Sequence, residues 1–167
     1  MYSSKKGEHD MEIVQYQDKY KVEAIQLILH IQNDESKVNM PLEGQPDLLD
    51  IPAYYIKRGG DFWVATDDNH VIGTIALMKI NDDWCVMKKF FVRSDYRSQK
   101  VGFALYSRLL DFANAKEFKH MVLDTPSVAK KAHLFYERAG FRRISKSDLA
   151  IEYDYLDRDS IIFQLDL

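Results

Sequence analysis

The chain has 167 residues, 46% of them hydrophobic, which suits one ordinary domain with a sizeable core. Its formal net charge of -3 gives no general attraction to nucleic acid or to an anionic membrane, so we expect neither as a partner. The N-terminus lacks the apolar stretch of a secretory signal, and no segment approaches the roughly 18 consecutive apolar residues of a membrane span. We therefore expect a single cytoplasmic domain over residues 1–167, with residues 1–10 as a flexible N-terminus.

The first half of the chain predicts a strand and a helix, then an irregular segment, and then three further strands. Residues 11–16 predict a short strand, and Asp18 is a candidate cap for the helix that follows. Residues 41–60 are less regular and predict a short helix that ends at Gly59 and Gly60. Three β-rich runs, separated by acidic turn clusters, then predict an antiparallel meander: residues 62–66, 71–80 and 84–92.

The third run of the meander carries large apolar side chains on both faces, which is typical of a central strand. Simple alternation along this run puts one set of side chains on each face: Trp84, Val86 and Phe90 against Cys85, Met87 and Phe91. Cys85 is the one cysteine of the chain, and a thiol in an apolar run more often serves packing than chemistry.

The second half of the chain predicts two helices and three strands. An apolar stripe from Val101 to Ala113 indicates a helix on the sheet, and residues 121–125 indicate a buried strand. A right-handed crossover would make this strand parallel to the run 84–92. A last helix over 128–139, with Val128 facing inward, should end at Gly140, followed by closing strands over 141–144 and 161–165. The predicted fold class is α+β, a mixed sheet with helices on its faces.

The start of the helix near residue 101 is a candidate anion site. The first turn of a helix leaves N–H groups without partners, and these attract phosphate together with the helix dipole. The amides concerned are those of Gln99, Lys100, Val101, Gly102, Phe103 and Ala104. Gly102 would let a ligand approach, but a tight entry into an ordinary helix accounts for it equally well. A dinucleotide fingerprint or a Walker loop is excluded, because the loop has one glycine and no G-K-S/T.

Two motifs taken together resemble a known family. Gln99, Gly102 and Ala104 form Q-x-x-G-x-A after the strand MKKFFV, and AHLFYERAGF follows at residues 132–141. In this combination, and in the order of its elements over residues 11–167, the chain resembles the GNAT superfamily of N-acetyltransferases. The resemblance implies a mostly antiparallel twisted sheet of about six to seven strands, in which a splayed parallel pair holds the cofactor.

The resemblance also implies how acetyl-CoA binds. Its pyrophosphate is expected on the amides of residues 99–104, and its pantetheine arm along Phe91 and Val92, paired like an extra strand. We expect no metal. Two departures from the family pattern are Ala129, where an asparagine is common, and Val86, where a glutamate is common. They leave open the alternative of a noncatalytic acyl-CoA-binding module.

Tyr136 is the candidate catalytic residue. In this family the equivalent tyrosine points at the sulfur of the thioester, so the resemblance implies that Tyr136 protonates the leaving thiolate. Periodicity alone would make it a packed residue of its helix. The general base remains open among His133, Asp83 and Asp124.

The acceptor is expected to be a primary amine of a small molecule or a peptide. The aromatic and irregular segment 40–62, with Tyr54, Tyr55 and Phe62, is expected to form one wall of its pocket, and Asp47 and Asp50 to attract a cation. The sequence leaves the oligomeric state open, a homodimer included.

Overall fold

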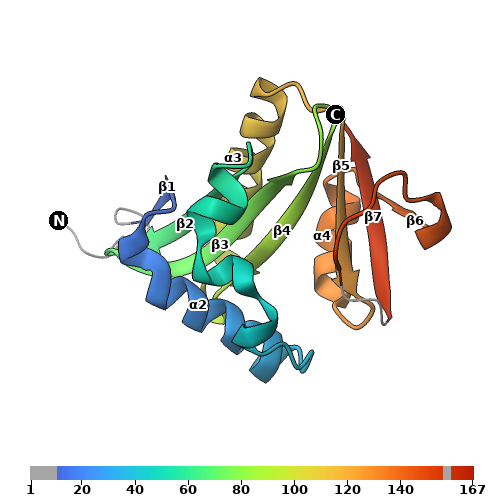
Figure 1. Cartoon of the computed structure of the whole chain (residues 1–167). Coiled ribbons are helices and arrows are strands. Elements are labelled where there is room, and N and C mark those ends of the chain that lie inside the picture. The colour runs from blue at the N-terminus through green and yellow to red at the C-terminus, as the bar shows by residue number, and fades with distance from the viewer. Residues whose placement is uncertain (1–10, 156–158) are drawn as a thin grey trace.

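A seven-stranded mixed sheet forms the centre of the computed structural model, which describes residues 11–155 and 159–167. Its strands are β1 (Met11–Gln15), β2 (Asp61–Asp67), β3 (His70–Lys79), β4 (Trp84–Val92), β5 (His120–Pro126), β6 (Arg142–Ile144) and β7 (Ser160–Asp166). They lie in the order β1-β2-β3-β4-β5-β7-β6 (Figure 1). Neighbours are antiparallel except β4 and β5, which are parallel. The mixed, mostly antiparallel sheet is confirmed, whereas the flexible N-terminus expected for 1–10 lies outside the described residues.

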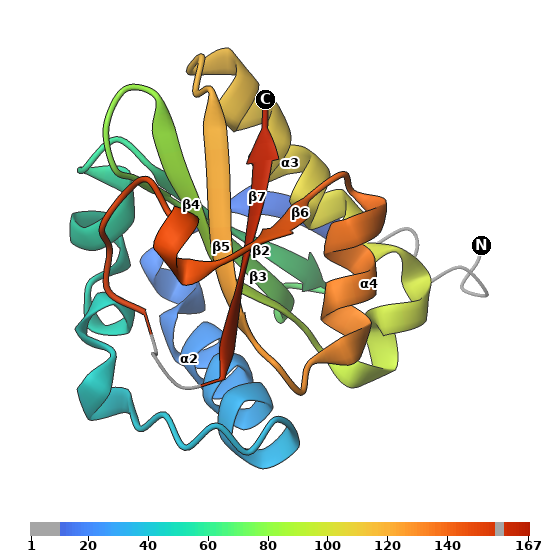
Figure 2. The same ribbon diagram turned by 90° about the vertical axis from the view of Figure 1, so that its right-hand side faces the viewer.

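Helices cover both faces of this sheet. They are α2 (Lys21–Leu29), α3 (Val101–Ala115) and α4 (Lys130–Arg138). Helices α3 and α4 lie on one face, and α2 lies on the other with the chain that follows it (Figure 2). Among the helices that the structure describes, none is long and apolar enough to cross a bilayer.

Short helical turns connect these elements, and the last of the three within 41–60 ends in the turn at Gly59 and Gly60, as predicted for a short helix there. They are η2 (Asp18–Tyr20), η3 (His30–Glu35), η4 (Leu42–Gly44), η5 (Pro46–Leu49), η6 (Pro52–Ile56), η7 (Ser94–Gln99) and η8 (Lys146–Asp148). Pro46 and Pro52 each begin a new turn, because proline has no N–H to continue a preceding helix. Asp18 begins η2 and makes no side-chain cap bond, so the predicted cap of α2 is wrong.

Two hydrophobic cores lie on the two faces of the sheet. The core under α3 and α4 includes the fully buried Leu105, Leu109 and Phe163. The core under α2 includes the fully buried Ile28, Leu48 and Phe62. Strand β4 is fourth of seven and contributes side chains to both cores, which confirms its predicted central place.

A β-bulge interrupts β4 at Lys89. The pairing of β3 with β4 shifts between Thr74, opposite Phe91, and Ala76, opposite Lys88, so β4 holds one extra residue there. Lys89 has a left-handed φ of 55°, and the Thr74 hydroxyl donates a hydrogen bond of 2.7 Å to its carbonyl. The bulge therefore redirects every side chain that follows it in β4.

This redirection corrects one prediction from alternation. Phe90 and Val92 pack with Met87 in the core under α3 and α4, whereas Phe91 packs against the core under α2. Alternation had placed Phe90 on the face opposite Met87. It was wrong because the extra residue at the bulge shifts the period of two by one position.

The last helix is shorter than predicted. It begins at Lys130, and Val128, predicted to face inward, is 70% exposed. Gly140 follows α4 with a left-handed φ of 96°, which confirms the predicted end of the helix.

Candidate active site

Strands β4 and β5 pair at one end and then diverge. Residues 84–86 of β4 lie opposite residues 120–122 of β5, and no pairing between the two strands continues beyond them, although β4 runs to Val92 and β5 to Pro126. Over the same stretch β5 stays paired with β7 (Figure 1). The splayed parallel pair implied by the family resemblance is therefore present, and the β5-facing edge of β4 is left unpaired after residue 86.

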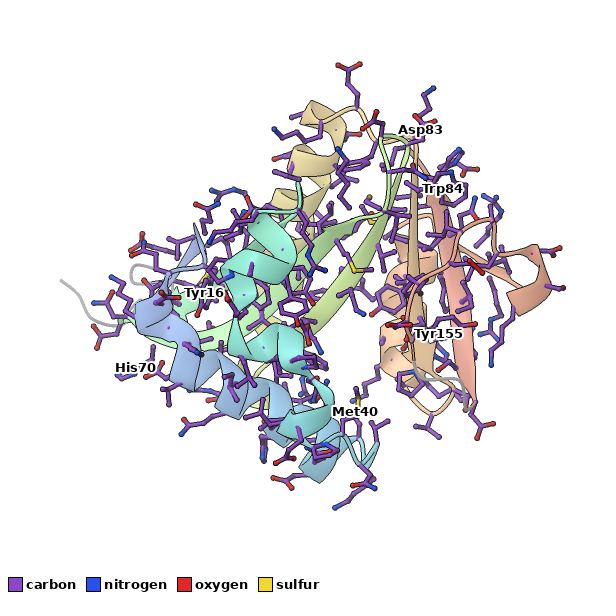
Figure 3. The ribbon with its side chains drawn as sticks, in the orientation of Figure 1. Tyr16, Met40, His70, Asp83, Trp84 and Tyr155 are labelled. Carbon is purple, nitrogen blue, oxygen red and sulfur yellow. The ribbon has the colours of Figure 1, made fainter. Side chains whose placement is uncertain are left out.

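The end where the two strands meet is closed by side chains and backbone bonds. The rings of Trp84 and His120 lie 4.3 Å apart between centroids. The Asp83 carbonyl accepts the N–H groups of Lys119 and His120 at 2.8 and 2.9 Å. Asp83 and Trp84 both lie at this end, while Met40 and Tyr155 lie on the two sides of the diverged end (Figure 3). Asp83, one of three candidate bases, is thus remote from the divergence.

The start of α3 presents backbone amides as predicted for an anion site. Lys100 precedes the helix with a left-handed φ of 63°. The N–H groups of Val101, Gly102 and Phe103 have no backbone acceptor among the described residues. The N–H of Ala104 already donates to the Lys100 carbonyl at 3.1 Å. Three amides of the predicted set are therefore free in the first turn, and a phosphate at Ala104 would have to share its bond.

Gly102 brings this helix start against the unpaired part of β4. A Cβ built on Gly102 would lie 3.5 Å from the ring of Phe90 and 3.7 Å from Val92, which is ordinary van der Waals contact. The packing of α3 on β4 therefore does not itself require a glycine. Any requirement for one would come from a ligand at the neighbouring amides.

Side-chain hydrogen bonds from Gln99 and Arg97 hold the loop before α3 in place. Gln99 donates from its amide to the Asp95 carbonyl at 3.2 Å. Arg97 donates from Nε to the Val92 carbonyl at 2.8 Å and from Nη2 to Glu35 at 2.5 Å. The loop thereby connects the end of β4 to the segment that follows α2.

Tyr136 lies in an aromatic cluster on the α3 and α4 face. Its side chain is 7% exposed, and its ring centroid lies 5.6 Å from that of Phe163 and 6.5 Å from that of Phe90. Burial, together with the charge of Asp124, raises the pKa of the Tyr136 hydroxyl well above its usual range. The hydroxyl therefore remains protonated at neutral pH.

Asp124 lies on β5, two residues beyond Val122, the last residue that pairs with β4. Its Oδ1 accepts a hydrogen bond of 2.9 Å from the Tyr153 hydroxyl. Burial raises the pKa of this carboxyl, while the nearby Lys88 ammonium and the bond from Tyr153 act against that increase. A carboxyl that binds protons more readily than usual thus stands at the divergence.

His133 is the third candidate base, and its ring is used within the fold. Its Nε2 lies 2.9 Å from the Pro126 carbonyl, and its ring packs 5.7 Å from that of Phe163. A carbonyl only accepts, so this nitrogen carries the proton and cannot itself accept another. Of the three candidates, Asp124 lies just beyond the last β4–β5 pair and has a carboxyl whose pKa burial raises.

A buried polar network lies behind the bulge on the α2 face. Lys89 donates from Nζ to Gln45 at 2.6 Å and lies 3.6 Å from an Asp47 oxygen. The Tyr55 hydroxyl donates to the same Asp47 oxygen at 2.6 Å. Burial lowers the pKa of Lys89, and Asp47 partly restores it. The cation that Asp47 was expected to attract is therefore this chain's own Lys89.

The expected pocket wall is corrected in the same region. Tyr55 is 2% exposed and Phe62 is 0% exposed, so both belong to the core under α2. Asp50 accepts the N–H of Ala53 at 3.2 Å and serves the turn at η6. Tyr55 and Phe62 are therefore too buried to contact an acceptor, whereas Asp50 is exposed.

Sequence reasoning missed Lys88, Lys89 and Tyr153 as residues of the site. The signal for the lysines was two adjacent charges inside an otherwise apolar strand, where charge is costly without a partner or a function. Tyr153 carried no comparable signal, because it lies outside helices and strands. Among residues 11–155 and 159–167, no group of three or more His, Cys, Asp or Glu side chains is placed to hold a metal ion.

Comparison with known proteins agrees with this geometry. A sequence model described as the acetyltransferase (GNAT) family matches residues 25–141. The chain belongs to this family. An acetyltransferase of known structure from Streptococcus agalactiae 2603 is 38% identical to it, with a TM-score of 0.92 over 95% of this chain and 99% of that chain.

Two further relatives extend the comparison. The N-acetylaspartate synthetase of Danio rerio is 36% identical over 104 residues, which are 61% of this chain and 37% of the synthetase, so this chain matches little more than a third of that relative's length. A GNAT family acetyltransferase from Elizabethkingia anophelis, solved with acetyl-CoA bound, is 18% identical with a TM-score of 0.64 over 95% of this chain and 99% of that chain. The latter likeness shows the shared fold.

Proposed function

We propose that this chain is an acetyl-CoA-dependent N-acetyltransferase, a single domain over residues 1–167, that acetylates a primary amine of a small molecule or peptide. The observation that carries the proposal is the divergence of β4 and β5 directly beside free amides at the start of α3. A phosphate group at those amides would leave an extended thiol arm to enter between the strands. Family membership and the acetyl-CoA complex of the Elizabethkingia anophelis relative support this ligand.

The cofactor-binding residues would act through their backbone. The amides of Val101, Gly102 and Phe103 would bind the pyrophosphate, with Gln99, Lys100 and Ala104 as the flanking positions of the same turn. The pantetheine arm would pair along Phe91 and Val92, where the edge of β4 has lost its β5 partner. Unpaired N–H groups of that edge would also polarise the thioester carbonyl.

Tyr136 would act as the general acid. Burial keeps its hydroxyl protonated, but it also makes the hydroxyl a weak acid. The thiolate that leaves in the same apolar site is affected in the same way, because desolvation raises the pKa of any thiol. Cys85, in the core beneath, has its pKa raised by burial to about 12. The pKa values of the Tyr136 hydroxyl and of the departing thiol are therefore raised together, so transfer of the proton from the hydroxyl to sulfur is preserved.

Asp124 would act as the general base, directly or through a water molecule. The family's frequent glutamate corresponds to Val86, which is fully buried at the last position where β4 pairs with β5. Asp124 lies two residues farther along the facing strand, held by the Tyr153 hydroxyl. It can accept a proton from the attacking amine after the tetrahedral adduct forms, while Tyr136 gives one to the departing sulfur.

The experiment is to incubate the purified chain with acetyl-CoA and a panel of primary amines and to measure the release of free CoA. Calorimetry with acetyl-CoA alone measures binding separately from turnover. We expect binding and amine-dependent release of CoA. Binding without turnover on any amine would instead favour the noncatalytic module, and failure to bind acetyl-CoA would exclude both functions.

A further inference from the structure

We propose that the amine acceptor of this enzyme carries a carboxylate near its amine, and that Lys88 binds that carboxylate on the α2 face of the β4–β5 divergence. The inference rests on the proposed acetyl transfer and adds the chemical class of the acceptor. The simplest molecule of this class is an amino acid.

The bulge in β4 creates the arrangement. Met87 and Phe90 both pack in the core under α3 and α4, so the two residues between them, Lys88 and Lys89, are both directed away from that core. Both ammonium groups act on the Asp124 carboxyl of the facing strand. Two positive charges and one candidate base therefore share the α2 side of the divergence, opposite the face that carries Tyr136.

The two lysines differ in how well they are paired. Lys89 has an 8% exposed side chain, and its ammonium is taken up by Gln45 and Asp47. Lys88 is half-buried and has no carboxylate within ion-pair distance among residues 11–155 and 159–167. Its contacts are a 3.4 Å bond to the Asp154 carbonyl and the ring of Tyr153, 5.7 Å from its Nζ. Because Lys88 is half-buried and its ammonium has only these two weak contacts, it is well placed to bind an anion.

The same charges select against other acceptors. An acceptor with several amines would bring additional positive charge toward Lys88 and Lys89, which is unfavourable in a partly desolvated site. An acceptor with a carboxylate a few bonds from its amine matches both partners at once. Its carboxylate meets Lys88, while its amine lies toward Asp124 across the divergence.

The test compares kcat/KM for a series of amino acids with that for the carboxamide of each, and with that for an aliphatic diamine. The α-amine of a carboxamide has the lower pKa and is more often neutral, so a preference for the acid cannot arise from the reactivity of the amine. We expect the acid to be preferred. In Lys88→Met the ratio of acid to carboxamide kcat/KM should fall roughly 10- to 100-fold, mainly through the acceptor KM, as for loss of a charge-assisted bond. Lys88→Arg should retain most of the wild-type ratio.

The matched control is Lys119→Met. Lys119 has a 69% exposed side chain and lies near Asp83 at the closed end of the strand pair. This substitution should therefore leave the ratio of acid to carboxamide kcat/KM unchanged. Equal rates for acid and carboxamide, or a preference for the diamine, would overturn this inference while leaving acetyl transfer intact. No turnover with any amine would overturn the proposed function itself.

Discussion

The two faces of the sheet differ most where β4 and β5 diverge. On the α3 and α4 face Tyr136 is surrounded by aromatic rings, whereas the α2 face carries Lys88, Lys89 and Asp124 with polar neighbours. Burial raises the pKa of Tyr136 and of Asp124 and lowers that of Lys89, so on both faces it favours the neutral form. Tyr136 on one face thus keeps a proton to give, and Asp124 on the other face, once ionised, accepts a proton more strongly than an ordinary carboxylate.

Replacing Tyr136 by Phe tests the donor face and should have the largest effect. The ring stays in its aromatic cluster, so folding should be preserved, while kcat should fall about 100- to 1,000-fold through loss of the general acid. Initial rates of CoA release and a thermal unfolding curve measure the two effects. A variant with the wild-type rate would remove Tyr136 from the acid role.

Asp124→Asn tests the opposite face. We expect kcat to fall about 100-fold at neutral pH, with binding of acetyl-CoA unchanged by calorimetry. In the wild type, kcat should rise with pH as Asp124 loses its proton, at a pH above the usual carboxyl range because burial raises its pKa. In Asp124→Asn this rise of kcat with pH should be absent. If the variant still shows the rise, another group is the base.

The same shift of Asp124 affects stability with a defined sign. The folded protein binds this proton more tightly than the unfolded chain, so the contribution of Asp124 is most favourable at low pH. It is lost as pH rises from about 3.9, the value of an unperturbed carboxyl, through the raised pKa of the folded state. Asp124→Asn should flatten this part of the stability profile in denaturant titrations at several pH values.

Gly102→Ala tests the anion site at the start of α3. The added Cβ meets Phe90 and Val92 at ordinary contact distances, so the free energy of unfolding should be preserved or increased by up to about 1 kcal/mol. The same Cβ adds bulk beside the free amides, so we expect the KM for acetyl-CoA to rise roughly 10-fold, about 1.4 kcal/mol. An unchanged KM would place the pyrophosphate elsewhere.

Tyr106→Phe should have the smallest effect and serves as the control for Tyr136. Tyr106 belongs to the same core and is 5% exposed, but its hydroxyl is buried with no hydrogen-bond partner among the described residues. Removing a desolvated, unpaired hydroxyl should stabilise the protein by about 1 kcal/mol and leave kcat unchanged. A loss of activity equal to that of Tyr136→Phe would show that the cluster as a whole, and not one hydroxyl, supports the reaction.

Much of the fold could be predicted because local patterns and the tertiary structure agree. The meander, the crossover that makes β4 and β5 parallel, and the helix end at Gly140 all follow from periodicity, handedness and glycine conformation. The prediction failed at Phe90, because a bulge adds one residue without any marker that a period-two pattern can detect. Lys89, with its left-handed φ, is not a residue type that signals such a position.

The residues of the candidate site also fall into two groups, those that the sequence could propose and those that it could not. Tyr136 and the turn at Gly102 lie in short motifs, so sequence alone could propose them. The roles proposed for Asp124 and Lys88 depend on neighbours far away in the chain, such as Tyr153, and spacing along the sequence carries no record of those contacts. Asp47 was expected to attract a cation, and that cation is Lys89, which lies 42 positions farther along the chain.

The short contact between β4 and β5 has a mechanical consequence. Strands β1 to β4 form one hydrogen-bonded block and β5 to β7 another, and among the described strands the two blocks are joined directly along residues 84–86 and 120–122 alone. Any change in the width of the space between the two blocks must therefore be absorbed at that junction, beside the adjacent rings of Trp84 and His120. The indole fluorescence of Trp84 is positioned to report such opening and closing as ligands arrive.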